Sequence, residues 1–280
     1  MIDTAEAGWK TPPEIGLSTA ALYPTHLTED ALATIAGLGF RVVEVFLQTA
    51  EEYTSAFGLE LNRRRRDLGI HVHSLHLYSP YFDMWSPYPR MAQETRGRFQ
   101  ALLDIATTLA AHALTWHGLR YGLEDAGLIN AFFESATWAG EQAQAAGITL
   151  CIENVSWCYL RTDEQVQAIR QAMLPVGFTF DTFQSGESGA DPTTLIQAMD
   201  GYLNTVHLAD YAPGGPRHLP PGDGILDWPS ILRALQKADY SGPLILEPAH
   251  IEDPTALLHA RDFVQQVLTQ VLAHAGPAEL

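Results

Sequence analysis

Short stretches of β-forming residues alternate with longer amphipathic stretches from about residue 14 to the end of the chain. This alternation is typical of β-α-β units, whose strands run parallel and whose helices cover the sheet. Eight strand segments are expected, at Ile15–Ser18, Val42–Phe46, Ile70–Leu77, Ala113–His117, Thr149–Asn154, Phe178–Asp181, Asn204–Leu208 and Leu244–Glu247. The sequence therefore predicts a protein of the α/β class with a parallel sheet.

Helical patterns fill the intervals between these segments. They are expected at Thr28–Leu38, Gln93–Ala110, Asp125–Ala146, Asp163–Ala172, Trp228–Ala238 and Pro254–Ala273. Thr28 and Thr162, each followed by two acidic residues, are expected to cap the starts of helices. Gly39, Gly69 and Gly147 are expected to end helices just before the next strand.

Eight β-α units can close into a barrel or form a long doubly wound sheet. A doubly wound nucleotide-binding sheet would carry a glycine-rich loop after its first strand, and residues 18–22 (STAAL) contain no glycine. We therefore predict a single (β/α)8 barrel. Such barrels commonly occupy about 250 residues as one unit. Residues 14–280 are accordingly expected to form one domain, preceded by a loosely held tail of residues 1–13.

The charge balance argues against nucleic acid as a partner. The chain has 33 acidic and 16 basic residues, a formal net charge of −17, and such a surface repels a phosphate backbone. One basic run, Arg63–Arg66, directly precedes Asp67, Leu68 and Gly69. We interpret it as the last turn of a helix, where cations complement the helix dipole.

Cysteine use and the absence of long apolar runs indicate a reduced, cytoplasmic protein. The spacing of Cys151 and Cys158 matches neither a zinc ribbon nor a CxxC redox pair. The first residues, MIDTAE, have no basic region and no apolar core, and no apolar stretch approaches the roughly 20 residues of a membrane span. No membrane association is expected, and the oligomeric state stays open, a homo-oligomer included.

Polar residues with metal-binding capacity end seven of the eight expected strands. They are Glu44, His76, His117, Glu153, Asp181, His207 and Glu247. A single histidine or carboxylate at such a position would usually be structural. In a (β/α)8 barrel, however, the carboxyl ends of all strands meet on the face where active sites are built. The seven residues together therefore predict one shared site.

Strand alternation supports this convergence. Residues two positions before the candidates should also face the barrel interior, and they are Ser74, Thr115, Cys151, Thr179, Thr205 and Ile245. The residues between should face the helices, and they are all apolar: Leu75, Trp116, Ile152, Phe180, Val206 and Leu246.

The last four strand ends form a set suited to a divalent ion. Glu153, Asp181, His207 and Glu247 offer three carboxylates and one imidazole, which suit Mn²⁺, Mg²⁺, Co²⁺ or Zn²⁺. Three carboxylates buried together without a cation could not all stay ionised. We therefore predict that these four side chains bind one metal ion.

The pattern resembles the xylose isomerase-like TIM barrels, a family of sugar phosphate isomerases and epimerases, over almost the whole chain. The specific segments are residues 151–154 (CIEN), 180–182 (FDT), 206–210 (VHLAD), 246–248 (LEP) and the loop 217–227. The resemblance implies that Glu153, Asp181, His207 and Glu247 hold one metal ion and that the two glutamates transfer protons. It also implies a small carbohydrate substrate.

The related endonuclease IV branch shares the barrel and adds further metal ligands, two of which His76 and His117 match. This chain departs from that branch at Gln184, where a histidine is expected, and at residues 216–218 (PRH), where Asp-x-His is expected. A third metal ion is therefore not expected. A second ion on His76, His117 and Glu153 remains an alternative to imidazoles that contact substrate or serve the structure.

The leading hypothesis is a metal-dependent sugar isomerase or epimerase that moves a proton through an enediolate with Glu153 and Glu247. The alternatives are a metal-dependent dehydratase acting on a keto-polyol or keto-inositol, an endonuclease IV-like phosphodiesterase, and a barrel that binds a metal or sugar without turnover. Expected substrate contacts are Glu44, Trp85, Asn154, Gln184, Arg217 and His218. The alternative for Glu44 is a role confined to hydrogen bonding. The alternative for the aromatic loop around Trp85 is simple packing.

Overall fold

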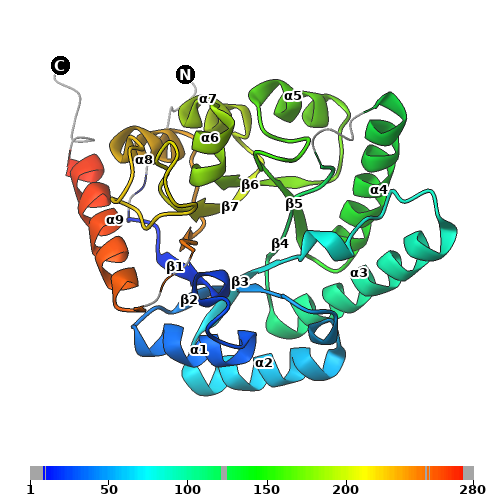
Figure 1. Cartoon of the computed structure of the whole chain (residues 1–280), viewed down its shortest axis with the longest axis horizontal. Helices are drawn as coiled ribbons and strands as arrows, with labels where there is room; N and C mark the ends of the chain where they lie inside the picture. Colours follow the sequence, from blue (N-terminus) through cyan, green and yellow to red (C-terminus); the bar gives the residue numbers. More distant parts are fainter. Residues whose placement is uncertain (1–8, 10, 121–124, 250, 252, 274–280) are drawn as a thin grey trace, which may run out of the picture.

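The computed structural model describes residues 9, 11–120, 125–249, 251 and 253–273. Eight parallel strands close into a barrel in chain order, with β8 paired to β1. They are β1 (Ile15–Ser18), β2 (Val42–Phe46), β3 (His71–His76), β4 (Ala113–Trp116), β5 (Thr149–Glu153), β6 (Gly177–Asp181), β7 (Leu203–Leu208) and β8 (Leu244–Leu246). Figure 1 shows the helices as a ring around these strands. The prediction of a (β/α)8 barrel is confirmed.

Nine α-helices lie within the described part of the chain. They are α1 (Thr28–Gly37), α2 (Ser55–Leu68), α3 (Pro89–Leu109), α4 (Ala126–Ala145), α5 (Asp163–Gln171), α6 (Thr182–Ser188), α7 (Pro192–Ala198), α8 (Trp228–Lys237) and α9 (Ala256–Ala273). Three short 3-10 helices, η1 (Thr19–Leu22), η2 (Ala50–Glu52) and η3 (Ser79–Tyr81), follow the first three strands. The short helices α6 and α7 were not among the expected segments.

The predicted helix ends are mostly confirmed. Gly39, Gly69 and Gly147 have φ angles of 88°, 64° and 74°, the left-handed region that glycine enters without strain. At the start of α5, the side chain of Gln165 accepts a hydrogen bond from the backbone of Thr162, as in a capping box. The expected cap at Thr28 is wrong, because α1 begins at Thr28 itself and is not capped by its hydroxyl.

The basic run lies in the last turns of α2, as expected. Arg63 and Arg64 contact Glu60 at 2.8 and 2.7 Å, and Arg64 also contacts Asp30 of α1 at 2.8 Å. Two of the four arginines, Arg63 and Arg64, are thus paired with acidic side chains, as expected at a solvated helix end.

The predicted alternation along the strands is confirmed by what the two faces contact. The outward residues Leu75, Trp116, Ile152, Phe180, Val206 and Leu246 are all fully buried in the apolar core under the helices. On the inner face, Ser74 donates to Glu44 at 2.8 Å, and the hydroxyls of Thr115 and Thr179 meet across the barrel at 3.0 Å. The interior below the strand ends is therefore filled with small polar side chains.

His73 and Tyr240 lie at the amino-terminal end of the barrel, where they help to line a hollow of about 450 Å³. A bulge in β3 pairs Val43 with Val72 and then Glu44 with Ser74, and it allows the His73 ring to contact a carbonyl of β7 at 3.3 Å. Tyr240 is 3% exposed, and its backbone carbonyl accepts a hydrogen bond from the indole of Trp9 at 2.5 Å. The expected tail thus has a contact with the barrel at Trp9, while residues 1–8 and 10 lie outside the described residues.

Two further sequence expectations bear on the environment of the protein. Among the described residues, none of the helices combines the length and the apolarity that a bilayer crossing requires. Cys151 and Cys158 are both buried. A cytoplasmic location stays a prediction.

Candidate metal centre

The carboxyl ends of the strands place acidic and imidazole side chains around one point. Glu153 and Asp181 are the last residues of β5 and β6, His76 is the last of β3, His207 lies near the end of β7, and Glu247 directly follows β8. Within the described chain, ligand atoms of His76, Glu153, His207 and Glu247 all lie within 4.8 Å of one another. The fold therefore brings together the side chains that the strand ends predicted.

Three carboxylates converge on one nitrogen of His207. Its Nδ1 lies 2.9 Å from Glu153 Oε1, 3.0 Å from Glu247 Oε2 and 4.0 Å from Asp181 Oδ2. A single N–H cannot satisfy three acidic groups, whereas a cation among the same atoms would. Glu153, His207 and Glu247 thus lie in one cluster, which includes His76, whereas Asp181 lies farther out at 4.0 Å; the expected four-ligand set stays a prediction.

Asp181 provides the clearest test of whether a cation fits this centre. Its Oδ1 accepts a hydrogen bond from the backbone of Gln184 at 2.6 Å, but its Oδ2 is buried without a hydrogen-bond partner. Burial, and then the negative charge of Glu153, raise the pKa of Asp181 well above its usual value. A divalent ion would give Oδ2 a partner and stabilise the ionised carboxylate, so the residues present fit a metal.

Glu44 lies beneath this centre rather than facing a substrate. It is fully buried, its Oε2 lies 2.9 Å from His207 Nε2, and it also accepts a hydrogen bond from Ser74. Burial alone would raise the pKa of Glu44, but the charge and hydrogen bond of His207 lower it to about 2. The expected contact with substrate hydroxyls is not supported, because the whole carboxylate is used inside the barrel. Its contact with His207 resembles that of the carboxylates that lie behind metal-ligating histidines.

His76 and His117 face the other oxygen of Glu153. Glu153 Oε2 lies 3.3 Å from His76 Nε2 and 3.0 Å from His117 Nε2, and the two nitrogens are 3.2 Å apart. Burial alone would lower the pKa of His76, but the hydrogen bond and charge of Glu153 raise it to about 9; burial lowers the pKa of His117. Glu153 therefore contacts His207 through one carboxylate oxygen and His76 and His117 through the other.

Asn154 and Gln184 are occupied by the backbone of neighbouring loops. The Asn154 amide donates to the carbonyl of Asp181 at 2.9 Å and accepts from its N–H at 2.8 Å. The Gln184 side-chain oxygen accepts from the N–H of Ser156 at 3.0 Å. The Asn154 bonds tie the ends of β5 and β6 together, and a substrate contact of either side chain stays a prediction.

Arg217 and His218 lie on the loop between β7 and α8. Arg217 forms an ion pair with Glu187 at 2.9 Å and is half exposed. The His218 ring stacks on Phe183 at 3.9 Å, and burial lowers its pKa to about 4. His218 is thus a neutral group at neutral pH, and the positive charge of Arg217 is already paired.

In the aromatic loop after β3, some side chains are buried in the core and others line a cavity. Phe82 is fully buried in the core, and Trp85 packs against Trp116 and Phe132 with ring centroids 5.8 Å apart in each case. Trp85 also lines a cavity of about 280 Å³ together with Trp157. Trp157 was missed in the sequence because no motif surrounds it; only its position after β5 could have indicated it.

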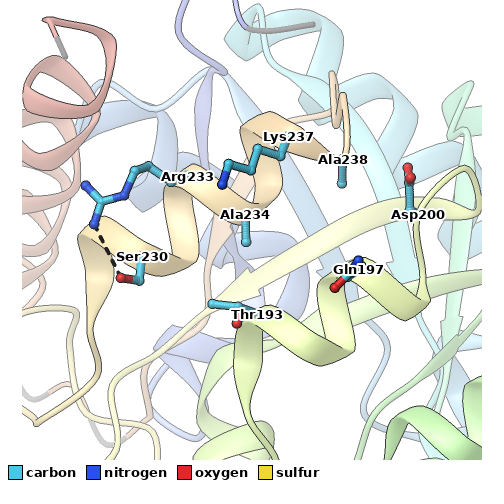
Figure 2. Close-up of a pocket in the computed structure, with 8 residues that line it drawn as sticks. All are labelled: Thr193, Gln197, Asp200, Ser230, Arg233, Ala234, Lys237 and Ala238. Carbon is cyan, nitrogen blue, oxygen red and sulfur yellow. Dashed lines mark hydrogen bonds between the residues drawn. The ribbon is translucent and has the colours of Figure 1, made fainter. Parts of the chain in front are cut away.

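Another hollow, of about 470 Å³, lies between α7 and α8 on the outside of the helical ring. Figure 2 shows the residues that line it, among which Arg233 donates to Ser230 at 3.3 Å. Its lining residues come from the two helices and the turns that follow them, far from the strand ends in the chain's topology. It offers no constellation of acid, base and metal ligands, and we assign the chemistry to the strand ends.

Known proteins resemble this chain in sequence and in fold. The L-ribulose-5-phosphate 3-epimerase UlaE of Escherichia coli O17:K52:H18 is 26% identical over 226 residues, which cover 78% of this chain and 66% of that protein. The putative L-ribulose-5-phosphate 3-epimerase SgbU of Escherichia coli K12 is 22% identical, covering 84% of this chain and 88% of that protein. A solved L-ribulose 3-epimerase superposes with a TM-score of 0.78 at 22% identity, covering 94% of this chain and 97% of that one.

A family model decides the affiliation. The model of the xylose isomerase-like TIM barrel matches residues 32–267, which include all seven polar strand ends. The closed barrel and the clustered strand-end residues agree with this match. The chain therefore belongs to the xylose isomerase-like TIM barrel family.

Proposed function

We propose that this protein is a metal-dependent sugar epimerase or isomerase. The observation that carries the proposal is the convergence of Glu153 and Glu247 on one point, His207 Nδ1, at 2.9 and 3.0 Å. A reaction that removes a proton from a carbon atom and returns it needs two such groups, because each acts as base in one direction and acid in the other.

Glu153, Asp181, His207 and Glu247 would hold the ion. Their oxygen-rich set with one imidazole suits Mn²⁺, Mg²⁺, Co²⁺ or Zn²⁺. When bound, such an ion polarises the carbonyl of a hydroxy-ketone and stabilises the negative charge that develops on it. The neutral His207 would donate from Nε2 to Glu44, which fixes the orientation of the ring.

The chain's own residues supply the proton transfer. Glu247 is 9% exposed and is the most open of the three carboxylates, whereas Glu153 is 2% exposed and is held by His76, His117 and His207. We propose that each glutamate serves one face of the carbon that loses its proton.

The names of the relatives support epimerisation of a ketose. They are L-ribulose-5-phosphate 3-epimerases by sequence, and the similar folds include an L-ribulose 3-epimerase and a D-psicose 3-epimerase. We therefore propose a ketose as the substrate class, with C3 as the carbon at which the proton is exchanged.

The proposal is tested by incubating the metal-loaded protein with L-ribulose in D2O. Epimerisation should exchange the hydrogen at C3 for deuterium, seen by NMR, with no change in mass beyond that exchange. Glu153→Gln and Glu247→Gln should each slow the exchange by about 10²- to 10⁴-fold. Asp67→Asn, on the far end of α2, is the matched control for loss of an acidic charge. Undiminished exchange in both glutamine variants would exclude this mechanism, and a product lighter by one water would indicate the dehydratase.

We further propose that the site can take a second ion. His76 Nε2, His117 Nε2 and Glu153 Oε2 form a triangle with sides of 3.0 to 3.3 Å. Ligands at about 2.0–2.1 Å from a tetrahedral ion are separated by similar distances. Metal analysis of protein dialysed against excess Mn²⁺ or Zn²⁺ should give two ions per chain, and His117→Ala should reduce this to one. A value of one for both proteins would leave the two histidines as substrate or structural groups.

A further inference from the structure

A cavity of about 280 Å³ opens beside the candidate metal centre, and we call it the distal pocket. Its walls come from the loops that follow β3, β4 and β5: Ser79, Pro80, Asp83, Trp85, Gly118, Arg120 and Trp157. His117 connects it to the metal centre, since its ring centroid lies 5.1 Å from that of Trp157 and its Nε2 lies 3.0 Å from Glu153.

The lining of the distal pocket has the features of a ligand site. Ser79 Oγ is buried without a hydrogen-bond partner. Asp83 is partly buried, and burial raises the pKa of its carboxyl group, while the charge of Arg120 opposes that shift. The Arg120 guanidinium in turn lies 5.4 Å from the centre of the Trp157 ring. Two indole rings and three hydrogen-bonding groups therefore surround one small cavity.

We propose, on the basis of the proposed function, that the distal pocket binds the non-reacting end of an uncharged sugar. Indole rings stack on the C–H faces of sugars, and Trp85 and Trp157 provide two of them. Asp83 can accept hydrogen bonds from sugar hydroxyls, and Arg120 and Ser79 can donate them. The sugar would extend from the metal centre past His117 into the pocket.

The charges of the catalytic face argue against a phosphate on this end of the sugar. Asp83 lines the pocket, so a phosphate dianion there would lie beside a carboxylate. The loops that follow the eight strands contain three arginines, Arg120, Arg161 and Arg217, and no lysine. Arg217 is paired with Glu187, and Arg161 donates to a backbone carbonyl at 3.2 Å. Arg120 is therefore the arginine that lines the pocket, and Asp83 offsets its charge.

The test compares two probes that differ by one phosphate, L-ribulose and L-ribulose-5-phosphate, with the metal-loaded full-length chain. We expect kcat/KM to be at least about tenfold higher for L-ribulose. A ligand that does not match the pocket loses hydrogen bonds to charged groups, and each such loss lowers the affinity by about this factor or more. Asp83→Asn should raise KM for L-ribulose by about tenfold and leave kcat nearly unchanged. Glu94→Gln, an exposed acid on α3 that does not line the pocket, should change neither value.

Intrinsic fluorescence gives a second measure that does not depend on turnover. L-ribulose should change the tryptophan emission of the protein, and Trp157→Phe should remove most of that change. Turnover that favours L-ribulose-5-phosphate, with KM unaffected by Asp83→Asn, would overturn the distal pocket while the proposed function stands. Absence of C3 exchange with both probes would instead refute the proposed function. In that case a fluorescence response lost in Trp157→Phe would still support the pocket, and no response would overturn it.

Discussion

Replacing Glu44 by glutamine should weaken metal binding although Glu44 is not one of the proposed metal ligands. The carboxylate accepts from His207 Nε2 at 2.9 Å and is fully buried. It therefore selects the tautomer in which Nε2 carries the proton and Nδ1 is free to bind the ion. A glutamine amide has nearly the same shape but can present either its oxygen or its NH2 group to the ring.

The size of the expected loss in metal affinity follows from the effect of removing the hydrogen-bond partner of a metal-ligating histidine. Loss of a carboxylate behind a metal-ligating histidine typically lowers metal affinity by about 10- to 100-fold. This corresponds to roughly 1.4–2.7 kcal/mol of binding free energy. The metal-free protein should also lose stability, because the ionised Glu44, with a pKa lowered to about 2, pairs with the charged form of His207 there.

The assay separates these two effects. Unfolding by urea is measured with a chelator and again at a fixed free Mn²⁺ concentration, and the difference gives the stabilisation by the ion. This increment should shrink by roughly 1.4–2.7 kcal/mol in Glu44→Gln at saturating metal. Val45→Ala is the control, because Val45 is fully buried on the same strand but belongs to the apolar core. It should lower stability by about 2 kcal/mol in both conditions and leave the increment unchanged.

An unchanged increment in Glu44→Gln would refute the reasoning. Glu44 would then be a structural group of the barrel interior, and its contact with His207 would have no bearing on metal binding. If Val45→Ala lost as much of the increment as Glu44→Gln, the same conclusion would follow, since the loss would reflect general weakening of the fold.

The remaining predictions concern the ion, the pH dependence and the tight interior of the barrel. Dialysis against a chelator should abolish C3 exchange and lower the melting temperature, and Mn²⁺ at 100 times its Kd should restore about 2.7 kcal/mol of stability. Burial lowers the pKa of His73 to about 4, so the folded state favours the neutral ring and loses stability as pH falls below 6.5. Between pH 6.5 and 5 this loss should reach about 2 kcal/mol in chelator, and urea unfolding of His73→Asn should lack it. Gly16→Ala should cost about 1–3 kcal/mol in denaturant unfolding, because its Cβ would lie 2.8 Å from the carbonyl oxygen of Val42; an unchanged midpoint would contradict this.

The part of the site that the sequence predicts is the part that strand geometry determines. Parallel strands in a closed barrel end on one face, and their side chains alternate. A polar residue at the end of a strand such as β5 or β7 can therefore be located without knowing any loop. The helix ends at Gly39 and Gly147 are predictable for a local reason. A left-handed backbone is favoured by glycine itself, whatever the rest of the fold.

Contacts made by loops could not be predicted, because they depend on where distant segments meet. Arg217 and Glu187 are 30 positions apart, and their ion pair joins the loop after β7 to α6. The bulge that moves His73 is equally hidden, since it shifts the alternation of β3 by one residue without a glycine to indicate it. The helices α6 and α7 span 7 residues each, too few for an amphipathic repeat to stand out.

Buried side chains fill the barrel interior beneath the metal centre. Thr115 and Thr179 meet across the barrel at 3.0 Å, and Glu44 and His207 above them are fully buried. An ion or a sugar bound at this centre would therefore arrive from the side of the strand ends, where the His117 side chain is 16% exposed. In the proposed function, a sugar at the strand ends would then cover a bound ion. A chelator should accordingly remove the ion more slowly from protein saturated with L-ribulose than from the free protein.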